Sequence, residues 1–146
     1  SYADGDEERI ITDWFESGKA GVSPVQFQQY NDTCGNCHCP YQPGLLPSVS
    51  WQKVMLDIEN HFGKPIKLSP VETRTITRYL LNNSAGHVND GVSYNILSSF
   101  DSNSDITRIT STPYFIKMHN HLKPGSNANN TGQCDSCHEG AAEGKY

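Results

Sequence analysis

The sequence has no long apolar run and little apolar material overall. Hydrophobic residues make up 35% of its 146 residues, and no stretch of about 18 apolar residues occurs, so a transmembrane helix is excluded. Basic residues are also scarce, because 11 Lys and Arg stand against 16 Asp and Glu, for a formal net charge of -5. A nucleic-acid partner is not expected, since binding of a phosphate backbone requires basic residues. The acidic balance instead favours docking onto basic surfaces.

The first residues, SYADGDEER, lack the basic and apolar regions of a signal peptide, and no methionine precedes Ser1. We therefore expect a mature exported protein, located in the periplasm, from which the signal peptide has been removed. The length is that of one ordinary domain. Residues 1–146 are accordingly predicted to form a single domain.

Strand-like alternation is weak everywhere, whereas helical spacing recurs. The run Ser48–Gly63 carries apolar residues at helical intervals and stops at its glycine. The tetrapeptide Ser69–Glu72 has the form of a capping box with proline in the first turn of a helix. Further packing helices are predicted at 7–17 and from Pro113 to a stop before Pro124. We predict a mainly α, loop-rich fold.

Two stretches predict loops. Residues 82–104 are rich in Asn, Ser, Gly and Asp, and they predict a long loop with one short turn at Tyr94–Phe100. Lys123–Gln133 predicts a second loop. A modest apolar fraction distributed this way indicates that something other than side chains completes the core.

The five cysteines are an odd number, which argues against a scaffold held only by disulfides. Four of them lie in two C-x-x-C-H motifs, Cys34–His38 and Cys134–His138, and this is the attachment signature of c-type haem. Two cysteines three positions apart lie on one side of a helical turn and can add to the two vinyl groups, while the histidine reaches the iron. The predicted covalent anchors of two haem c groups are Cys34, Cys37, Cys134 and Cys137, and the predicted proximal iron ligands are His38 and His138.

Other sites also use CxxC pairs. In a four-cysteine zinc site the pairs are roughly 15–20 residues apart, whereas here the whole of residues 38–133 lies between them. Zinc also gives no reason for a histidine directly after both pairs. A redox dithiol is disfavoured because no strand–helix thioredoxin pattern surrounds either pair. Two buried porphyrins would in addition supply the apolar surface that the side chains lack.

The sixth iron positions need further ligands. His61 lies three residues after Ile58 on the apolar stripe of the predicted helix 48–63. His119 lies on the stripe that Phe115 begins in the helix after Pro113. We therefore predict His61 and His119 as distal ligands, and proximity in sequence assigns His61 to the first haem and His119 to the second. A crossed pairing fits the same residues.

The remaining candidates are weaker. His121 is turned roughly 200° from His119 around a helix and should face solvent, and His87 lies among turn-forming residues. Met118 and Met55 are expected to be packing residues. Two bis-histidine irons have no easy open position, and the absence of methionine ligands lowers the potential. The pattern predicts a low-potential electron carrier and not an enzyme.

Cys39 remains outside both motifs. It follows a predicted iron ligand directly and precedes Pro40. Two interpretations stay open: a thiol shielded by packing, or a disulfide between two copies of the chain in an oxidising compartment.

Longer stretches around these motifs resemble the DHC-type dihaem cytochromes c. The resemblance covers roughly residues 30–140 and is carried by CGNCHCPYQPGLLPSVSWQKVMLDIENHFG, ITSTPYFIKMH and CDSCH. It implies a mainly helical fold with two bis-histidine haems, and it places distal ligands at His61 and His119. It also implies periplasmic electron delivery from a membrane b-type cytochrome toward a small oxygen-binding monohaem cytochrome. Cys39, His87 and His121 are not part of the family pattern.

Three other functions stay open at this point. One iron with a displaceable distal ligand would make the protein a haem enzyme or a gas sensor. The protein could also be an electron-donating subunit of a periplasmic reductase. The response of the ferrous spectrum to CO separates a closed electron carrier from a protein with an open iron.

Overall fold

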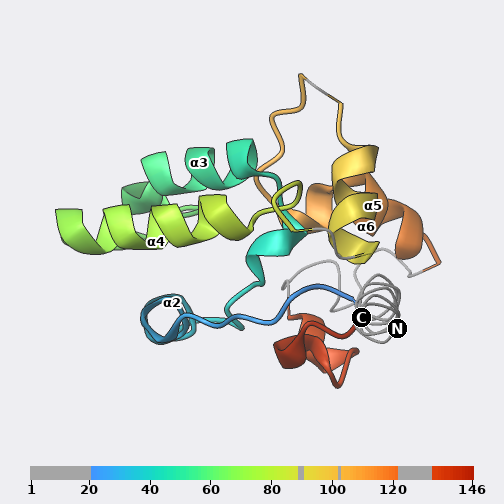
Figure 1. The fold of residues 1–146 in the computed structure, drawn as a ribbon, viewed down its shortest axis with the longest axis horizontal. Coiled ribbons are helices and arrows are strands. Elements are labelled where there is room, and N and C mark those ends of the chain that lie inside the picture. Colours follow the sequence, from blue (N-terminus) through green and yellow to red (C-terminus); the bar gives the residue numbers. More distant parts are fainter. Residues whose placement is uncertain (1–20, 89–90, 102, 122–132) are drawn as a thin grey trace, which may run out of the picture.

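The computed structural model describes residues 21–88, 91–101, 103–121 and 133–146. Regular structure within these ranges is helical and includes no strand (Figure 1). The longer helices are α2 (Gln28–Cys34), α3 (Ser48–Leu56), α4 (Pro70–Asn83), α5 (Gly91–Ser99) and α6 (Pro113–Met118). Short 3-10 helices are η1 (Pro43–Leu45), η2 (Ile58–Asn60), η3 (Ile109–Ser111), η4 (Cys134–Ser136) and η5 (Ala141–Glu143). The predicted mainly α class is confirmed.

Two sequence predictions lie outside these ranges. The helix at 7–17 and almost all of the loop Lys123–Gln133 belong to segments that the structure does not describe. Among the helices that it does describe, none is both long enough and apolar enough to cross a membrane.

Helices α3 and α4 lie side by side and form the main core (Figure 1). Trp51 and Met55 from α3 are buried together with Ile76 and Leu80 from α4. Burying each such side chain contributes about 1.5–3 kcal/mol relative to leaving it exposed. The indole Nε1 of Trp51 donates a hydrogen bond to Pro43 O at 2.7 Å, so the one polar atom of this side chain is satisfied. Met55 is a core residue, as predicted.

The start of α4 confirms Ser69 as the predicted cap and Pro70 in the first turn. The side-chain oxygen of Ser69 accepts a hydrogen bond from the backbone N–H of Glu72, and Pro70 occupies the first turn, where a missing N–H has no cost. Ile76 and Leu80 face inward, whereas Val71 is 61% exposed. One face of the helix is therefore buried and the opposite face is open.

The predicted helix 48–63 is too long by about two turns. Helix α3 ends at Leu56, a 3-10 turn follows, and His61 has extended backbone. Phe62 then adopts a positive φ of 49°, followed by Gly63 at 88°, and the Lys64 N–H closes this turn on His61 O at 3.0 Å. Ile58 nevertheless packs against the core, because the 3-10 turn keeps it on the buried side.

The predicted loop at 82–104 is wrong over α5. Ser93 and Ile96 of this helix are buried, and the helix contacts η1 and α6. Its Asn, Ser and Gly content concealed an apolar i, i+4 spacing from Val92 to Ile96, and tertiary contacts override weak helix propensity. Ile96 belongs to a second, smaller core cluster with Val22 and Leu45.

Helix α6 is shorter than predicted, because it ends at Met118. The predicted cap is present: the Thr112 hydroxyl accepts from the Phe115 N–H. His119 is the C-cap residue, so it stands at the end of the helix and not on its interior stripe. Met118 is 51% exposed, which contradicts its predicted role as a packing residue.

The C-terminal segment lies against the segment that precedes α2 (Figure 1, red and blue). The Val22 N–H donates to Gly144 O at 2.8 Å. Gly144 has a φ of 78°, and a Cβ there would lie 2.0 Å from Val22 O, so only glycine fits. The fully buried Gln42 adds a second link, because its Nε2 donates to Ala141 O at 2.6 Å. These contacts bring the two CxxCH segments into one half of the molecule.

Candidate functional site

The first CxxCH motif begins at the last residue of α2. Cys34 ends the helix, and the next N–H, of Gly35, still bonds to Asn31 O at 2.9 Å. His38 follows in a turn, and its Nδ1–H donates to Cys39 O at 2.7 Å. A proton held on Nδ1 leaves the lone pair of Nε2 for a metal. Tyr41 stacks on the same imidazole with ring centroids 4.8 Å apart.

His61 faces His38. Their ring centroids are 6.3 Å apart and the ring planes differ by 22°. Imidazole nitrogens bind a transition metal at about 2 Å, so two rings on opposite sides of one ion have centroids about 6 Å apart. Nδ1 of His61 is buried without a hydrogen-bond partner among the described residues. Burial lowers the pKa of His61, and the nearby His38 and Arg108 lower it further, which favours the neutral ring that metals bind.

The second motif forms the 3-10 turn η4 and not an α-helix. The His138 N–H bonds to Cys134 O at 2.9 Å, which folds the motif back on itself. His119 reaches His138 from the end of α6, with ring centroids 6.1 Å apart and planes at 82°. The Nδ1–H of His119 donates to Phe115 O at 2.8 Å, and Phe115 stacks on this ring at 3.9 Å.

These ring pairs are the uncrossed ones. His61 lies beside His38, and His119 lies beside His138. The other candidates are elsewhere: His121 and His87 are both exposed, and the Nδ1 of His87 is 3.1 Å from Ser84 Oγ. The structure therefore gathers four of the six histidines into two separate pairs.

The four motif cysteines differ in how far they are buried. Cys34 and Cys134 are half-buried, and burial is the main cause that raises the pKa of each thiol to about 11. Cys37 and Cys137 are exposed. All five cysteines lie in the described ranges and no disulfide joins any of them. Each motif thus presents one sheltered and one open thiol next to its histidine.

Within the described ranges, no three His, Cys, Asp or Glu side chains are grouped as a metal site. The four-cysteine zinc site, which was the alternative interpretation of the CxxC pairs, is therefore not formed by the residues that the structure describes. Two imidazoles on opposite sides of one ion suit an iron whose remaining positions are filled by a porphyrin. The ring spacing of both pairs, and the two thiols that precede each motif histidine, fit a covalent haem at each pair.

Other residues of the site have no signal in the sequence. Tyr146 meets the His138 ring edge-on at 5.5 Å and donates its hydroxyl proton to Gln42 Oε1 at 2.6 Å. Arg108 lies over the ring of Phe62, the residue after His61. Arg108 becomes a neighbour of the first pair only through contacts between distant segments, so no motif could have indicated it. Tyr41 and Tyr146 lie three and eight residues after the motif histidines that they contact.

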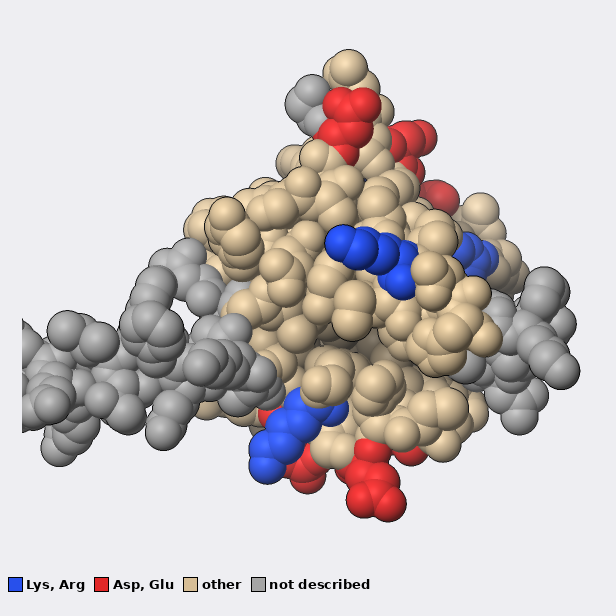
Figure 2. Space-filling view, turned by 90° about the vertical axis from the view of Figure 1, so that its right-hand side faces the viewer, with Lys and Arg blue, Asp and Glu red and all other residues tan. Residues whose placement is uncertain are grey.

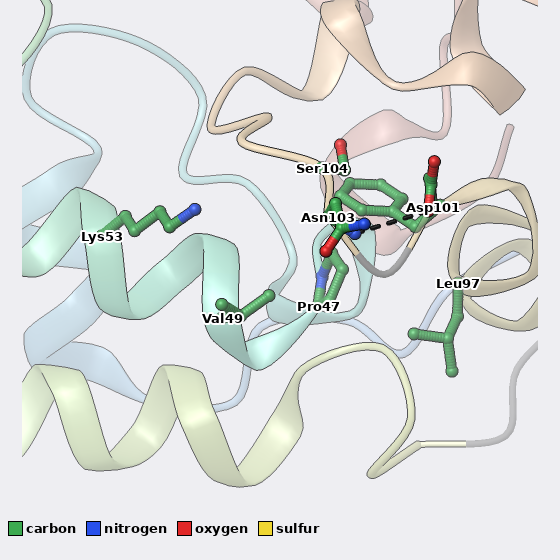
Figure 3. Close-up of a pocket in the computed structure, with 8 residues that line it drawn as sticks. Pro47, Val49, Lys53, Leu97, Asp101, Asn103 and Ser104 are labelled. Atoms are coloured by element: carbon green, nitrogen blue, oxygen red, sulfur yellow. Dashed lines mark hydrogen bonds between the residues drawn. The ribbon is translucent and has the colours of Figure 1, made fainter.

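Figure 3 shows a surface cavity of about 470 Å³ that is lined by no residue of either histidine pair. It is lined by Pro47, Val49, Lys53, Leu97, Phe100, Asp101, Asn103 and Ser104. The lining comes from the start of α3, the end of α5 and the loop that follows α5. The lining contains no histidine or cysteine, so this cavity is not part of the predicted haem sites.

The comparisons with known proteins agree with this geometry. A solved structure described as a diheme cytochrome c from Rhodobacter sphaeroides has 29% sequence identity and a TM-score of 0.76, covering 86% of this chain and 100% of its own. A second, the diheme cytochrome sb-DHC from Shewanella baltica OS155, has 28% identity and a TM-score of 0.62, covering 81% of this chain and 85% of its own.

The comparison with curated proteins finds no significant match. The family model for the DHC dihaem cytochromes c matches residues 30–146, which is most of the sequence. This confirms the resemblance predicted from the motifs, and it makes an electron-transfer cytochrome the class of the protein. The chain therefore belongs to the DHC family of dihaem cytochromes c and carries two c-type haems.

Proposed function

We propose that the protein is a periplasmic electron carrier with two bis-histidine haems. In this proposal His38 and His61 bind one iron, His119 and His138 bind the other, and the cysteines of each motif form the thioethers. The observation that carries it is the ring spacing of 6.3 and 6.1 Å in the two pairs. A haem iron held between two imidazoles exchanges one electron and offers no easy position for substrate.

The chain's own groups keep two of the four histidines, one in each pair, in the binding tautomer. Cys39 O accepts the Nδ1 proton of His38, and Phe115 O accepts that of His119. Such hydrogen bonds orient the ring and increase the basicity of the free nitrogen. Rings held before the iron is oxidised or reduced need not move when its charge changes, which suits rapid electron transfer.

The proposed partners are a membrane b-type cytochrome as donor and a small monohaem cytochrome as acceptor. The formal charge of -5 favours docking onto a basic partner through a small, weak interface. Figure 2 shows one face on which Asp and Glu lie at the upper tip and lower edge, with Lys and Arg between them. We therefore expect binding that weakens with salt, but less steeply than for a uniformly acidic face.

Cys39 takes no part in this function as we propose it. Its thiol is only partly exposed, and its Sγ is 4.0 Å from Pro40 O. A disulfide between two copies would have to displace these neighbours. We expect the mobility of the protein to be the same on reducing and non-reducing gels.

The response of the ferrous holoprotein to CO tests the closed coordination. Absorbance spectra recorded with and without CO should be the same, because both axial positions of both irons are taken. His87→Ala and His121→Ala, which change histidines outside the two pairs, should give the same unchanged spectrum. A prompt CO shift of about half the Soret intensity in the unmodified protein would favour an enzyme or a gas sensor over a carrier.

A further inference from the structure

Arg108 places a positively charged side chain close to the first histidine pair. Its guanidinium carbon lies 4.2 Å from the centre of the Phe62 ring. Phe62 in turn meets the ring of His61 edge-on, with centroids 4.8 Å apart. The cation therefore stands one side chain away from a proposed iron ligand.

A braced segment holds Arg108 in this place. Ser50 in α3 donates its hydroxyl proton to Ile106 O at 2.7 Å, and Lys53 in the same helix pairs with Asp105. On the other side of Arg108, Ile109 packs against the core. Arg108 is thus fixed to α3, the helix that also leads to His61, although the two residues are far apart in sequence.

The backbone at Phe62 shows why this contact is needed. A φ of 49° is unusual for a bulky residue and costs conformational energy. Its ring is 44% exposed, so burial alone does not hold it. A cation over the ring face is attracted to the aromatic quadrupole. Arg108 thereby stabilises the reversed turn that directs His61 toward His38.

The charges near the two pairs also differ. Arg108 lies over the Phe62 ring that contacts His61. Glu59 and Lys64 flank His61 in sequence with opposite charges. The second motif instead contains an anion, Asp135, between its cysteines. Reduction removes one unit of positive charge from an iron, so a nearby cation favours the reduced form.

We propose that Arg108 is a positioning residue of the first haem, holding Phe62 against His61 and raising the reduction potential of that haem selectively. The inference rests on the proposed ligation by His38 and His61. The step that it biases is the uptake of one electron by the ferric iron from a reduced partner, in which no bond breaks and no proton moves.

Redox titration of the holoprotein, followed by absorbance, tests this role. His61→Met first identifies the potential that belongs to the first haem, because methionine ligation raises it. Arg108→Gln should then decrease the equilibrium constant for reduction of that haem at least about threefold, which lowers its potential by roughly 30 mV for a one-electron couple. Arg108→Lys should recover most of the loss, and Arg74→Gln, which removes a cation from the exposed face of α4, should move neither potential selectively.

The outcomes separate this inference from the proposed function. If His61→Met raises one potential but Arg108→Gln leaves that potential unchanged, the role of Arg108 is wrong and the ligation stands. If Arg108→Gln and Arg74→Gln shift both potentials equally, only net charge acts and the inference is again wrong. If His61→Met changes neither potential nor spectrum, the proposed ligation itself fails.

Discussion

The two histidine pairs share a motif but are held in different ways. In the first pair the rings are nearly parallel, at 22°, and His61 comes from a turn with a positive φ at the next residue. In the second pair the planes differ by 82°, and His119 is the C-cap of α6 with its Nδ1 bonded to Phe115 O. The spacing of the rings is nearly the same. Ring spacing is thus kept by both arrangements, whereas ring angle and support are free to differ.

The charges around the pairs differ as well. The first motif has the neutral residues Gly35 and Asn36 between its cysteines, and Arg108 lies near its distal histidine. The second motif has Asp135 at the corresponding place, and this carboxylate helps raise the pKa of Cys134, after burial and Cys39. Two chemically identical cofactors would therefore be placed in electrostatically different surroundings.

Removal of a distal histidine should have the largest effect on this comparison. His61→Ala and His119→Ala should each make about half of the ferrous haem bind CO, with the other half unchanged, because each variant opens one iron. We expect the surroundings of the opened haem to be better ordered in His119→Ala than in His61→Ala, since Phe115 and the α6 cap remain. CO difference spectra measure both effects. A variant that opened both irons, or neither, would show that the pairs are not independent ligand sets.

Exchange of the motif charges should have a smaller effect. Asp135→Asn should increase the equilibrium constant for reduction of the second haem about twofold, which raises its potential by roughly 20 mV. The reason is that an anion that favours the ferric state is removed. Asn36→Asp is the reciprocal variant and should lower the first potential. Gly35 is unsuitable for that purpose, since a Cβ there would lie 2.3 Å from Asn31 O. Equal shifts of both potentials in either variant would remove the electrostatic distinction between the sites.

The weakest expected effect concerns the ion pair of Lys53 and Asp105, which braces the segment before Arg108. Its hydrogen bond to Lys53, together with the nearby ammonium charge, lowers the pKa of Asp105. Because the folded pKa lies below the unfolded one, any stabilisation is present at neutral pH and is lost as the pH falls through the folded value. The Asp105 side chain is exposed to solvent, where an ion pair contributes little to stability, so Asp105→Asn should hardly change the denaturation midpoint at pH 7.

The same variant also bears on the first haem. Asp105→Asn should shift its potential only slightly, because weaker bracing of Arg108 lowers that potential whereas removal of the anion itself raises it, and it should leave the second potential alone. Urea unfolding at pH 7 and at pH 3, together with the redox titration, measures both predictions. A larger shift at the second haem would contradict the idea that this segment serves the first site.

Much of the local structure could be predicted from residues a few positions apart. The cap at Ser69 and the proline after it predict the start of α4, and Thr112 predicts the start of α6, because a cap depends only on a short stretch of chain. Helix ends were predicted less well. The apolar stripe from Trp51 to Ile58 continues across the end of α3, because a 3-10 turn keeps the same face buried. Helix α5 was missed because its stability comes from contacts with η1 and α6.

The chemistry of this protein can be predicted from short motifs: two CxxCH motifs specify two covalent haems, since the anchoring groups and one ligand lie within five consecutive residues. Tertiary contacts select which histidines face one another, bring His61 in from a turn, and place Arg108 over Phe62 and Tyr146 edge-on to His138. Arg108 reaches this place through packing between segments far apart in the chain, and Tyr146 is held beside His138 by its hydrogen bond to the distant Gln42. No local pattern encodes them, because their positions depend on how the whole core closes.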